Sequence, residues 1–313
     1  MKLSIIIPAM NEEENIDTIY NTVKTVFENI NYEVIFIDDG SKDKTFKVLE
    51  SVYKKDKNHV KVIGFSRNFG KDAAIYAGLQ SAVGEYTAII DADMEQNPSY
   101  LLKMLTFLEN NPEYDQVAMK IKKRKAGSAI KKLGGKMFYK VINLLSDTKF
   151  SNDVSDFRMF RSNVRDALLS LPEKNRFSKG IFSWIGFNTK EMEYDVGKRT
   201  KGETKFNFKA SVKYALNGIV GFSVKPLKLA TIFGAITSIS GFIYLVYIII
   251  KTICVGIETP GFATIVCLIL FIGGIQLLTI GILGEYLAKT FLETKNRPVY
   301  IARKKLGLDE DIL

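Results

Sequence analysis

The sequence predicts an α/β protein with a mainly parallel sheet that has helices on both faces, followed by a C-terminal hairpin of two transmembrane helices. Short β-branched runs alternate with helical segments in the first third of the chain. Acidic residues follow two of these runs, and two long uncharged stretches lie near the C-terminus. Such alternation predicts a mainly parallel sheet, because each parallel connection needs a crossover helix.

Composition excludes several classes of protein. The chain has 313 residues, of which 47% are hydrophobic and 25% charged, and these values exclude a disordered or collagen-like chain. The formal net charge is +10, yet the apolar region at residues 229–284 contains only two charged residues, Lys251 and Glu258. Both cysteines, Cys254 and Cys267, lie in that region, which excludes a disulfide framework and a cysteine-based zinc site. The single histidine, His59, lies in a polar segment, which argues against Ser-His-Asp catalysis and histidine-ligated metals.

The N-terminal elements follow from two periodicities. Residues 3–8 form a β-branched run that ends at Pro8, and similar runs are typical of buried strands. The segment after it places Ile16, Ile19, Tyr20 and Val23 at helical spacing. Strands are predicted at residues 3–8, 32–38, 60–65 and 86–90, and helices at residues 11–29, 45–53 and 71–82.

Acidic residues follow the second and fourth strands. Asp38 and Asp39 come after one, and Asp91 and Asp93 after the other. Ligands of parallel sheets bind at these carboxyl ends. If the last segment is extended, alternate side chains share a face at about 6.6 Å spacing, so Asp91, Asp93 and Glu95 would point one way. Such a carboxylate cluster suits Mg²⁺ or Mn²⁺, and the alternative is a solvated acidic turn. Dinucleotide-binding and P-loop glycine motifs are absent from the sequence.

Two uncharged runs, residues 229–250 and 262–284, are predicted to cross a membrane. The first has 22 residues, about 33 Å as a helix, against a bilayer core of about 30 Å. Two buried core helices are the weaker alternative, because soluble helices are rarely apolar on every face. The outer flanks are more basic than the short connection, so the positive-inside rule places the N-terminal part and both termini in the cytoplasm.

Several short motifs occur in order along nearly the whole chain. They are Pro8-Ala9-Met10-Asn11-Glu12, Asp38-Asp39-Gly40-Ser41, Ser66-Arg67-Asn68-Phe69-Gly70-Lys71, Asp91-Ala92-Asp93, Ser155-Asp156-Phe157-Arg158, Trp184-Ile185-Gly186-Phe187 and Gly202-Glu203-Thr204-Lys205-Phe206. With these motifs and the two-helix tail, the chain resembles glycosyltransferase family 2, and within it the polyprenyl-phosphate sugar synthases. The resemblance implies a GT-A fold that binds a nucleotide sugar and moves the sugar to a polyprenyl phosphate.

The resemblance also implies the residues of the donor site. Asp38 or Asp39 would hydrogen-bond the base or ribose, and Asp91 would lie beside the sugar and nucleotide. Arg67 and Lys71 would lie near the donor phosphates, the alternative being ordinary surface charges. The residues implied to bind the nucleotide sugar are Pro8, Ala9, Asn11, Glu12, Asp38, Asp39, Arg67, Lys71, Asp91 and Ala92.

The expected cofactor is Mg²⁺ or Mn²⁺, held by Asp93, Glu95 and Asp91. The family usually has Gln where this chain has Glu95, so the extra negative charge is predicted to make Glu95 a direct ligand that strengthens metal binding. A cation there would stabilise the departing diphosphate. Met10 is a second departure, since the family often has Tyr at this point.

The resemblance assigns the reaction itself to Asp93 and Asp156 as catalytic residues. Asp156 would face the reacting centre, either as a base or as an orienting group. The acceptor phosphate has a second pKa of about 6, so it is mostly a dianion at neutral pH and has little need of a strong base. Direct displacement would invert the anomeric centre and give a β-linked product from an α-linked donor.

Cationic side chains are expected to hold the acceptor phosphate, because the same site contains carboxylates. The Gly-x-Arg element of the family is not clearly present in residues 117–124, which leaves Lys120, Lys122 and Arg124 as alternatives. The acceptor candidates are Lys120, Arg124, Arg176, Arg199 and Lys205.

The expected organisation is a cytoplasmic GT-A catalytic domain at residues 1–205, an amphipathic membrane-interface segment at 206–228, two transmembrane helices within 229–290 and a cytoplasmic tail at 291–313. The expected donor is UDP-glucose or UDP-N-acetylglucosamine, and the acceptor undecaprenyl or another polyprenyl phosphate. Further expected partners are the membrane and a second copy of the chain, but no nucleic acid. The alternatives are a processive polysaccharide synthase, which needs a Gln-x-x-Arg-Trp element and more membrane helices, and a catalytically silent membrane scaffold.

Overall fold

An eight-stranded sheet forms the centre of the part of the chain that the computed structural model describes, namely residues 1–122, 154–174, 176–197, 220–221, 223–255 and 261–308. The strand order is β7-β5-β6-β4-β1-β2-β3-β8. The strands are β1 Leu3–Ala9, β2 Tyr32–Asp38, β3 Val60–Phe65, β4 Tyr86–Ile89, β5 Gln116–Ile121, β6 Val154–Arg161, β7 Thr189–Tyr194 and β8 Ala302–Leu306. Only β6 and β8 run against the common direction of the others, which confirms the mainly parallel sheet.

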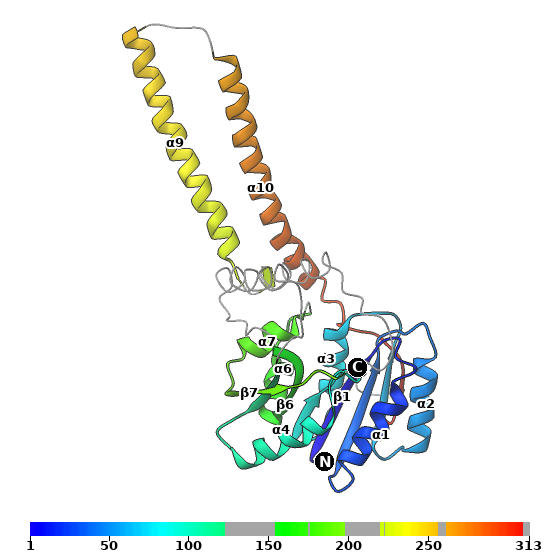
Figure 1. The fold of residues 1–313 in the computed structure, drawn as a ribbon. Coiled ribbons are helices and arrows are strands. Elements are labelled where there is room, and N and C mark those ends of the chain that lie inside the picture. The colour runs from blue at the N-terminus through cyan, green and yellow to red at the C-terminus, as the bar shows by residue number, and fades with distance from the viewer. Residues whose placement is uncertain (123–153, 175, 198–219, 222, 256–260, 309–313) are drawn as a thin grey trace.

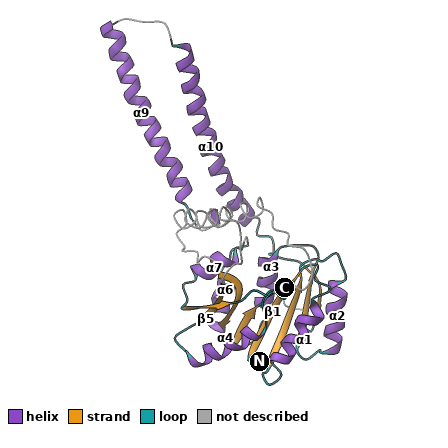
Figure 2. Cartoon of the chain, in the orientation of Figure 1, coloured by secondary structure: helices purple, strands orange, loops and turns teal. Residues whose placement is uncertain are grey.

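Helices cover both faces of this sheet, as predicted (Figure 2). They are α1 Ile16–Val26, α2 Thr45–Lys55, α3 Lys71–Ser81, α4 Ser99–Asn110, α6 Ser162–Ser170 and α7 Ser178–Trp184. Side chains of β1 alternate between two buried layers, because successive residues of a strand point to opposite faces. Leu3, Ile5 and Ile7 pack with α1, α2 and α4, whereas Ile6 packs with α3, α6 and α7.

The antiparallel strand β6 lies between β4 and β5 and sets the position of Asp156. Ile89 of β4 pairs with Arg158 of β6. This pairing places the start of β6, with Asp156, beside the end of β4, which Asp91 follows, and Lys71 contacts both acids. Two acidic residues far apart in the sequence therefore meet at one edge of the sheet.

Two long helices, α9 Lys225–Val255 and α10 Phe262–Thr294, project from the domain as a pair (Figure 1). Within them, Lys225–Lys251 and Phe271–Thr294 have mean hydropathies of 2.0 and 1.5, and neither is buried in the protein. By length and composition both helices are able to cross a membrane. Both helices extend closer to the domain than the predicted runs: α9 begins at Lys225 instead of residue 229, and α10 ends at Thr294 instead of residue 284. Of the interface segment, residues 206–219 lie outside the described part of the chain.

The segment after α10, which the sequence analysis placed in a tail, returns to the sheet. Residues 302–306 pair with β3 as the antiparallel edge strand β8. Just before it, the Tyr300 ring stacks on Phe65 with 4.8 Å between ring centroids, and its hydroxyl donates to Gln80 Oε1 at 2.9 Å. The Ser66 amide donates to the Ile301 carbonyl at 2.9 Å. The chain leaving the second long helix is thus bound to β3 and α3.

We expect Tyr300→Ala to lower the unfolding temperature of the detergent-solubilised protein, because it removes the ring from Phe65 and the hydroxyl from Gln80. For a partly buried aromatic side chain the loss is about 2 kcal/mol, or roughly 4–8 °C for a domain of this size. Tyr300→Phe, which removes only the hydroxyl, should cost about 1 kcal/mol. An unchanged unfolding temperature for Tyr300→Ala would show that this segment does not anchor to the sheet.

Candidate active site

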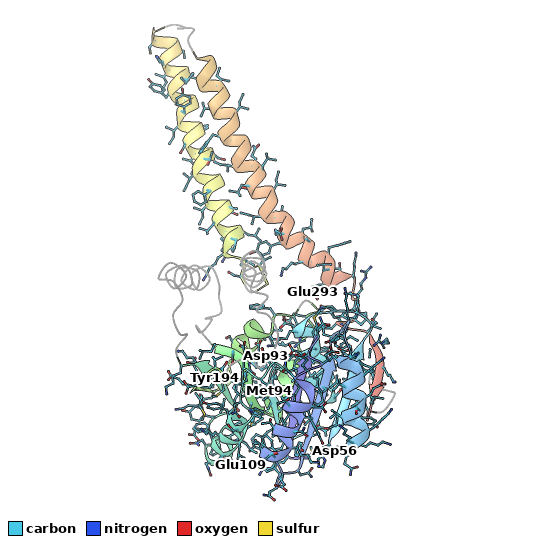
Figure 3. All side chains as sticks on the ribbon, turned by 45° about the vertical axis from the view of Figure 1, so that its right-hand side comes forward. Asp56, Asp93, Met94, Glu109, Tyr194 and Glu293 are labelled. Atoms are coloured by element: carbon cyan, nitrogen blue, oxygen red, sulfur yellow. The ribbon has the colours of Figure 1, made fainter. Side chains whose placement is uncertain are left out.

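The carboxyl ends of the parallel strands lie on the side of the domain from which the long helices leave (Figure 1). Figure 3 shows Asp93 and Met94 on this side, with Glu109 and Asp56 near the opposite end and Glu293 where α10 meets the domain. The backbone amide of Lys174 donates to Glu293 Oε2 at 3.0 Å, which joins α10 to the loop after α6. The acidic edge of the sheet therefore faces the base of the helix pair.

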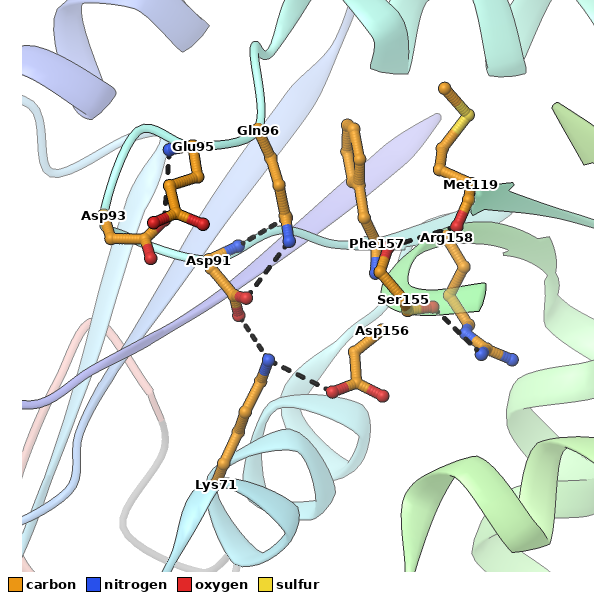
Figure 4. A network of polar contacts seen from close by, with 10 residues as sticks. All are labelled: Lys71, Asp91, Asp93, Glu95, Gln96, Met119, Ser155, Asp156, Phe157 and Arg158. Carbon is orange, nitrogen blue, oxygen red and sulfur yellow. Dashed lines mark hydrogen bonds and ion pairs between the residues drawn. The ribbon is translucent and has the colours of Figure 1, made fainter. Parts of the chain in front are cut away.

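Lys71 joins two acidic residues at this edge. Its ammonium nitrogen lies 2.6 Å from Asp91 Oδ1 and 3.1 Å from Asp156 Oδ2 (Figure 4). Lys71 belongs to the first turn of α3, whereas Asp91 follows β4 and Asp156 belongs to β6. Burial alone would lower the pKa of Lys71, but attraction to the two carboxylates outweighs it and raises that pKa above its usual value, so the ammonium stays charged.

Gln96 holds the other oxygen of Asp91. Its side-chain amide donates to Asp91 Oδ2 at 3.1 Å, and its carbonyl oxygen accepts the Asp91 backbone amide at 3.0 Å. Gln96 is only 5% exposed, so these bonds form away from water. Gln96 was not predicted to be a site residue, because in the sequence it is simply a polar residue at the end of an acidic run.

The segment after β4 is a turn and not an extended strand, so the prediction that three carboxylates share one face was wrong. Met94 has a φ of 62°, in the left-handed region, so the chain bends between Asp93 and Glu95. Asp91 turns instead toward Lys71 and Gln96. In the part of the chain that is described, no three His, Cys, Asp or Glu side chains gather as a metal cluster.

Asp93 and Glu95 remain side by side in this turn (Figure 4). The Glu95 amide donates to Asp93 Oδ1 at 3.1 Å, and the Glu95 carbonyl accepts the Gly197 amide at 2.8 Å. A Cβ added to Gly197 would lie 3.0 Å from the Met94 carbonyl oxygen, so the glycine permits this close approach. Two neighbouring carboxylates of this kind fit Mg²⁺ or Mn²⁺, which take oxygen ligands and complete their coordination with substrate phosphates.

Arg158 lies on the same face of β6 as Asp156, two residues away. It is 4% exposed, its guanidinium carbon lies 3.8 Å from the centre of the Phe182 ring, and its Nη2 donates to the Ser155 carbonyl at 3.3 Å. Burial lowers the pKa of Arg158 to about 10, while Asp156 opposes that shift. The Asp-Phe-Arg motif therefore places the acid Asp156 and the buried cation Arg158 near each other on β6.

The loops after β1, β2 and β3 contact one another at the carboxyl ends of these strands, and this group of loops is called the corner. The Asn11 amide donates to Ser41 Oγ, and Asn11 Oδ1 accepts the Lys42 amide, each at 2.9 Å. Gly40 has a φ of 68°, and a Cβ there would lie 2.3 Å from the Arg67 backbone. Only glycine fits such a contact at positive φ. The three loops are thus packed and hydrogen-bonded together.

Asp38 and Asp39 differ in their contacts at this corner. Asp39 accepts the backbone amides of Phe69 and Gly70 at 2.7 and 3.0 Å, so it holds the start of α3. Asp38 accepts the Ser41 amide at 3.1 Å through Oδ1, while its buried Oδ2 has no hydrogen-bond partner among the described residues. Burial raises the pKa of both carboxyls above the usual value.

The other expected donor residues lie around the same corner. Pro8 and Ala9 end β1, and the Glu12 amide donates to Thr45 Oγ1 at 2.9 Å. Ala92 is buried beneath the turn that follows β4. Arg67 is exposed, and its guanidinium lies 3.9 Å from the centre of the Phe69 ring. The structure therefore places Arg67 at the corner but brings Lys71 to the two acids.

The acceptor candidates that are described have protein partners. Lys120 Nζ lies 3.5 Å from Glu191 Oε2 on the neighbouring strand. Arg176 donates to the carbonyls of Leu168 and Leu171 at 2.7 and 3.2 Å, and burial lowers the pKa of its guanidinium. The remaining candidates, Arg124, Arg199 and Lys205, lie outside the described residues.

Known proteins resemble the chain in both of its parts. Residues 4–169 match Glycosyl transferase family 2, and residues 225–290 match the GtrB C-terminal hairpin. A prophage bactoprenol glucosyl transferase homolog of Escherichia coli K12 is 38% identical over 306 residues, covering 97% of this chain and 99% of the relative. An uncharacterized glycosyltransferase of Synechocystis is 37% identical over 311 residues, covering 99% and 97%.

Solved structures share the fold of the N-terminal part. Glucosyl-3-phosphoglycerate synthase of Mycobacterium tuberculosis, crystallised with Mn²⁺, UDP and phosphoglyceric acid, superposes with a TM-score of 0.51. The sequences are 16% identical, and the match covers 70% of this chain and 76% of the synthase. The likeness extends the GT-A arrangement of sheet and helices to this chain.

We expect Asp38→Asn to raise the unfolding temperature at pH 8. The folded-state pKa of Asp38 is raised by burial, so its ionised form costs stability as pH rises from the ordinary carboxyl value through the raised one. As the pH falls well below the ordinary carboxyl pKa of 3.8, the carboxyl becomes protonated in both states, and the difference from the wild type should disappear. Thermal unfolding across this pH range measures the effect.

Asp17→Asn is the matched control for this prediction, because the Asp17 side chain is 59% exposed. It should show no comparable pH-dependent difference from the wild type. A lower unfolding temperature for Asp38→Asn at every pH would mean that the Asp38 charge stabilises the fold.

Proposed function

The chain belongs to glycosyltransferase family 2, and on this premise we propose that it transfers a sugar from a nucleotide sugar to a polyprenyl phosphate at the cytoplasmic face of a membrane. One observation carries the proposal: the Asp91–Lys71–Asp156 cluster lies at the edge of the sheet from which the hydrophobic helix pair leaves. An acceptor with its phosphate at the membrane surface would reach that edge directly. Relatives that carry both parts and are named bactoprenol glucosyl transferase support this choice of acceptor.

The donor is UDP-glucose or UDP-N-acetylglucosamine in this proposal. The corner formed by the loops after β1, β2 and β3 would take the nucleoside, with Asp38 rather than Asp39 toward the base, since Asp39 is occupied by two backbone amides. The complex of the mycobacterial fold neighbour with UDP supports a uridine nucleotide. Asp91, fixed by Lys71 and Gln96, would lie beside the sugar.

Asp93 and Glu95 would hold the divalent cation, Mg²⁺ or Mn²⁺, together with oxygens of the donor diphosphate. The cation supplies positive charge where the leaving diphosphate develops negative charge. Neighbouring carboxylates in a fixed turn fit this role, and the Mn²⁺ of the fold neighbour supports it. Asp91 is not part of this ligand pair, because both of its oxygens have other partners.

Asp156 would face the anomeric carbon and the incoming phosphate. The acceptor is already mostly ionised, so direct displacement needs orientation more than proton removal. Displacement from the face opposite the leaving diphosphate inverts the anomeric centre. Among the acceptor candidates we assign the phosphate to Arg124, Arg199 and Lys205, since Lys120 and Arg176 are engaged elsewhere.

The membrane orientation follows from the same arrangement. The long helices α9 and α10 would cross the bilayer as a hairpin, with the catalytic domain and both chain ends in the cytoplasm, where nucleotide sugars are made. The basic residues at the domain end of the hairpin support this orientation by the positive-inside rule.

The proposal is tested by incubating purified protein with undecaprenyl phosphate, Mn²⁺ and a panel of labelled nucleotide sugars. We expect label to enter an organic-extractable, mild-acid-labile lipid, and Asp156→Asn to reduce the rate at least about 100-fold because it removes a charge at the reacting centre. Asp166→Asn, at an exposed position outside the site, is the matched control. A polymeric product would favour a processive synthase, and no transfer from any donor would favour a scaffold.

We further expect Glu95→Gln to raise the Mn²⁺ concentration that gives half-maximal rate by about 10-fold, because a neutral amide binds a hard cation more weakly than a carboxylate. Binding of Mn²⁺ to the UDP-bound protein, measured by electron paramagnetic resonance, should weaken in parallel. Equal metal dependence of variant and wild type would remove Glu95 from the ligand set.

A further inference from the structure

Lys71 occupies a position that its expected contact with the donor phosphates does not explain. Its ammonium lies between Asp91 and Asp156, with both N–O distances short enough for charge-assisted hydrogen bonds. The Asp156 side chain is 13% exposed and that of Lys71 is 40% exposed. The lysine therefore bridges from the rim of the site to an acid that is mostly enclosed.

The surroundings of Lys71 fix the start of α3 from two directions. Asp39 accepts the backbone amides of Phe69 and Gly70, which ties this turn to the end of β2. The neighbouring Asp72 accepts the Ser178 amide at 2.9 Å, which ties the same turn to α7. The backbone of Lys71 is therefore held on both sides. This fixes the point from which its side chain extends to the two acids.

The positive charge of Lys71 explains its position between the two acids. Asp91 and Asp156 both contact the same ammonium, so their carboxylates are neighbours, and two neighbouring carboxylates repel. A cation between them removes this repulsion and orients one oxygen of each. Without the ammonium, Asp156 would turn toward other partners or solvent, and the reacting centre would lose its orientation.

We infer that Lys71 is a positioning residue for Asp156, holding that carboxylate toward Asp91 and the reacting centre, and is not chiefly a ligand of the donor diphosphate. The inference rests on the proposed function for its reaction, but it concerns only the pairing of these side chains. It predicts that the effect of Lys71 on catalysis passes through Asp156.

A double-mutant cycle tests this inference with Lys71→Met, Asp156→Asn and the double variant. We expect Lys71→Met to lower kcat by about 100-fold while the donor KM and the Kd for UDP stay within about 3-fold, because the change affects orientation more than ground-state binding. The double variant should be no slower than Asp156→Asn alone, since residues that act as a unit are not additive. Lys71→Arg, which keeps a cation, should recover part of kcat.

Lys55→Met is the matched control, because among the described residues the only ion pair of Lys55 is a long one at the surface, with Asp17. It should leave kcat, KM and UDP binding unchanged. Lys71→Gln, closer to lysine in length and polarity, replaces Lys71→Met if the latter does not unfold cooperatively.

The inference is overturned if the rate losses multiply in the double variant, or if Lys71→Met weakens UDP binding 10-fold or more, since either result assigns Lys71 to the donor. The proposed function is judged separately, by transfer from wild-type protein to polyprenyl phosphate. If another acceptor proves to be used, the cycle is measured with that acceptor. A cycle in unfolding temperature tests the ion pair without any substrate: no coupling between Lys71→Met and Asp156→Asn would also overturn the inference.

Discussion

The Asp91–Lys71–Asp156 cluster depends on the antiparallel pairing of β6 with β4. This pairing brings Asp156 near Asp91, although the two are 65 positions apart in the chain. Lys71 then joins the two acids from α3, so three elements meet in one cluster of charges. If β6 ran parallel to β4, the start of β6 would lie beside the start of β4. The motif with Asp156 would then lie at the opposite end of the sheet from Asp91.

Backbone contacts at this edge connect the corner proposed for the nucleoside with the cluster proposed for the reacting centre. Asp39 follows β2 at the corner proposed for the nucleoside, yet its carboxylate holds the turn that begins α3. Lys71 is one residue further along that turn. Adjacent acids in one motif thus differ in their contacts. Asp39 binds two backbone amides, whereas one buried oxygen of Asp38 has no hydrogen-bond partner among the described residues.

The sequence predicted those elements whose pattern is local. Buried parallel strands are nearly continuous apolar runs, and the long helices are apolar on every side, so both were visible in the sequence. Strand β8, with Arg303, Lys304 and Lys305, reads as a basic tail, since an edge strand is held by backbone pairing more than by apolar side chains. The partners of Lys71 and the turn at Met94 depend on tertiary contacts and backbone dihedrals that spacing does not encode. Motifs therefore identified the family, and only the fold identified which side chains contact one another.

In the proposed membrane orientation, the return of the chain from α10 to β3 would fix how the domain is oriented relative to the bilayer. Seven residues, 295–301, separate the end of α10 from β8, and Tyr300 and Ile301 within them are already bound to the domain. A helix turns by about 100° for each residue. Inserting or deleting one residue near the domain end of α10 would therefore swing the sheet around the helix axis, whereas a change of seven residues, nearly two full turns, would restore its azimuth. In the proposed orientation, the number of helical residues at the domain end of α10 would thus determine which way the Asp91–Lys71–Asp156 cluster faces relative to the membrane.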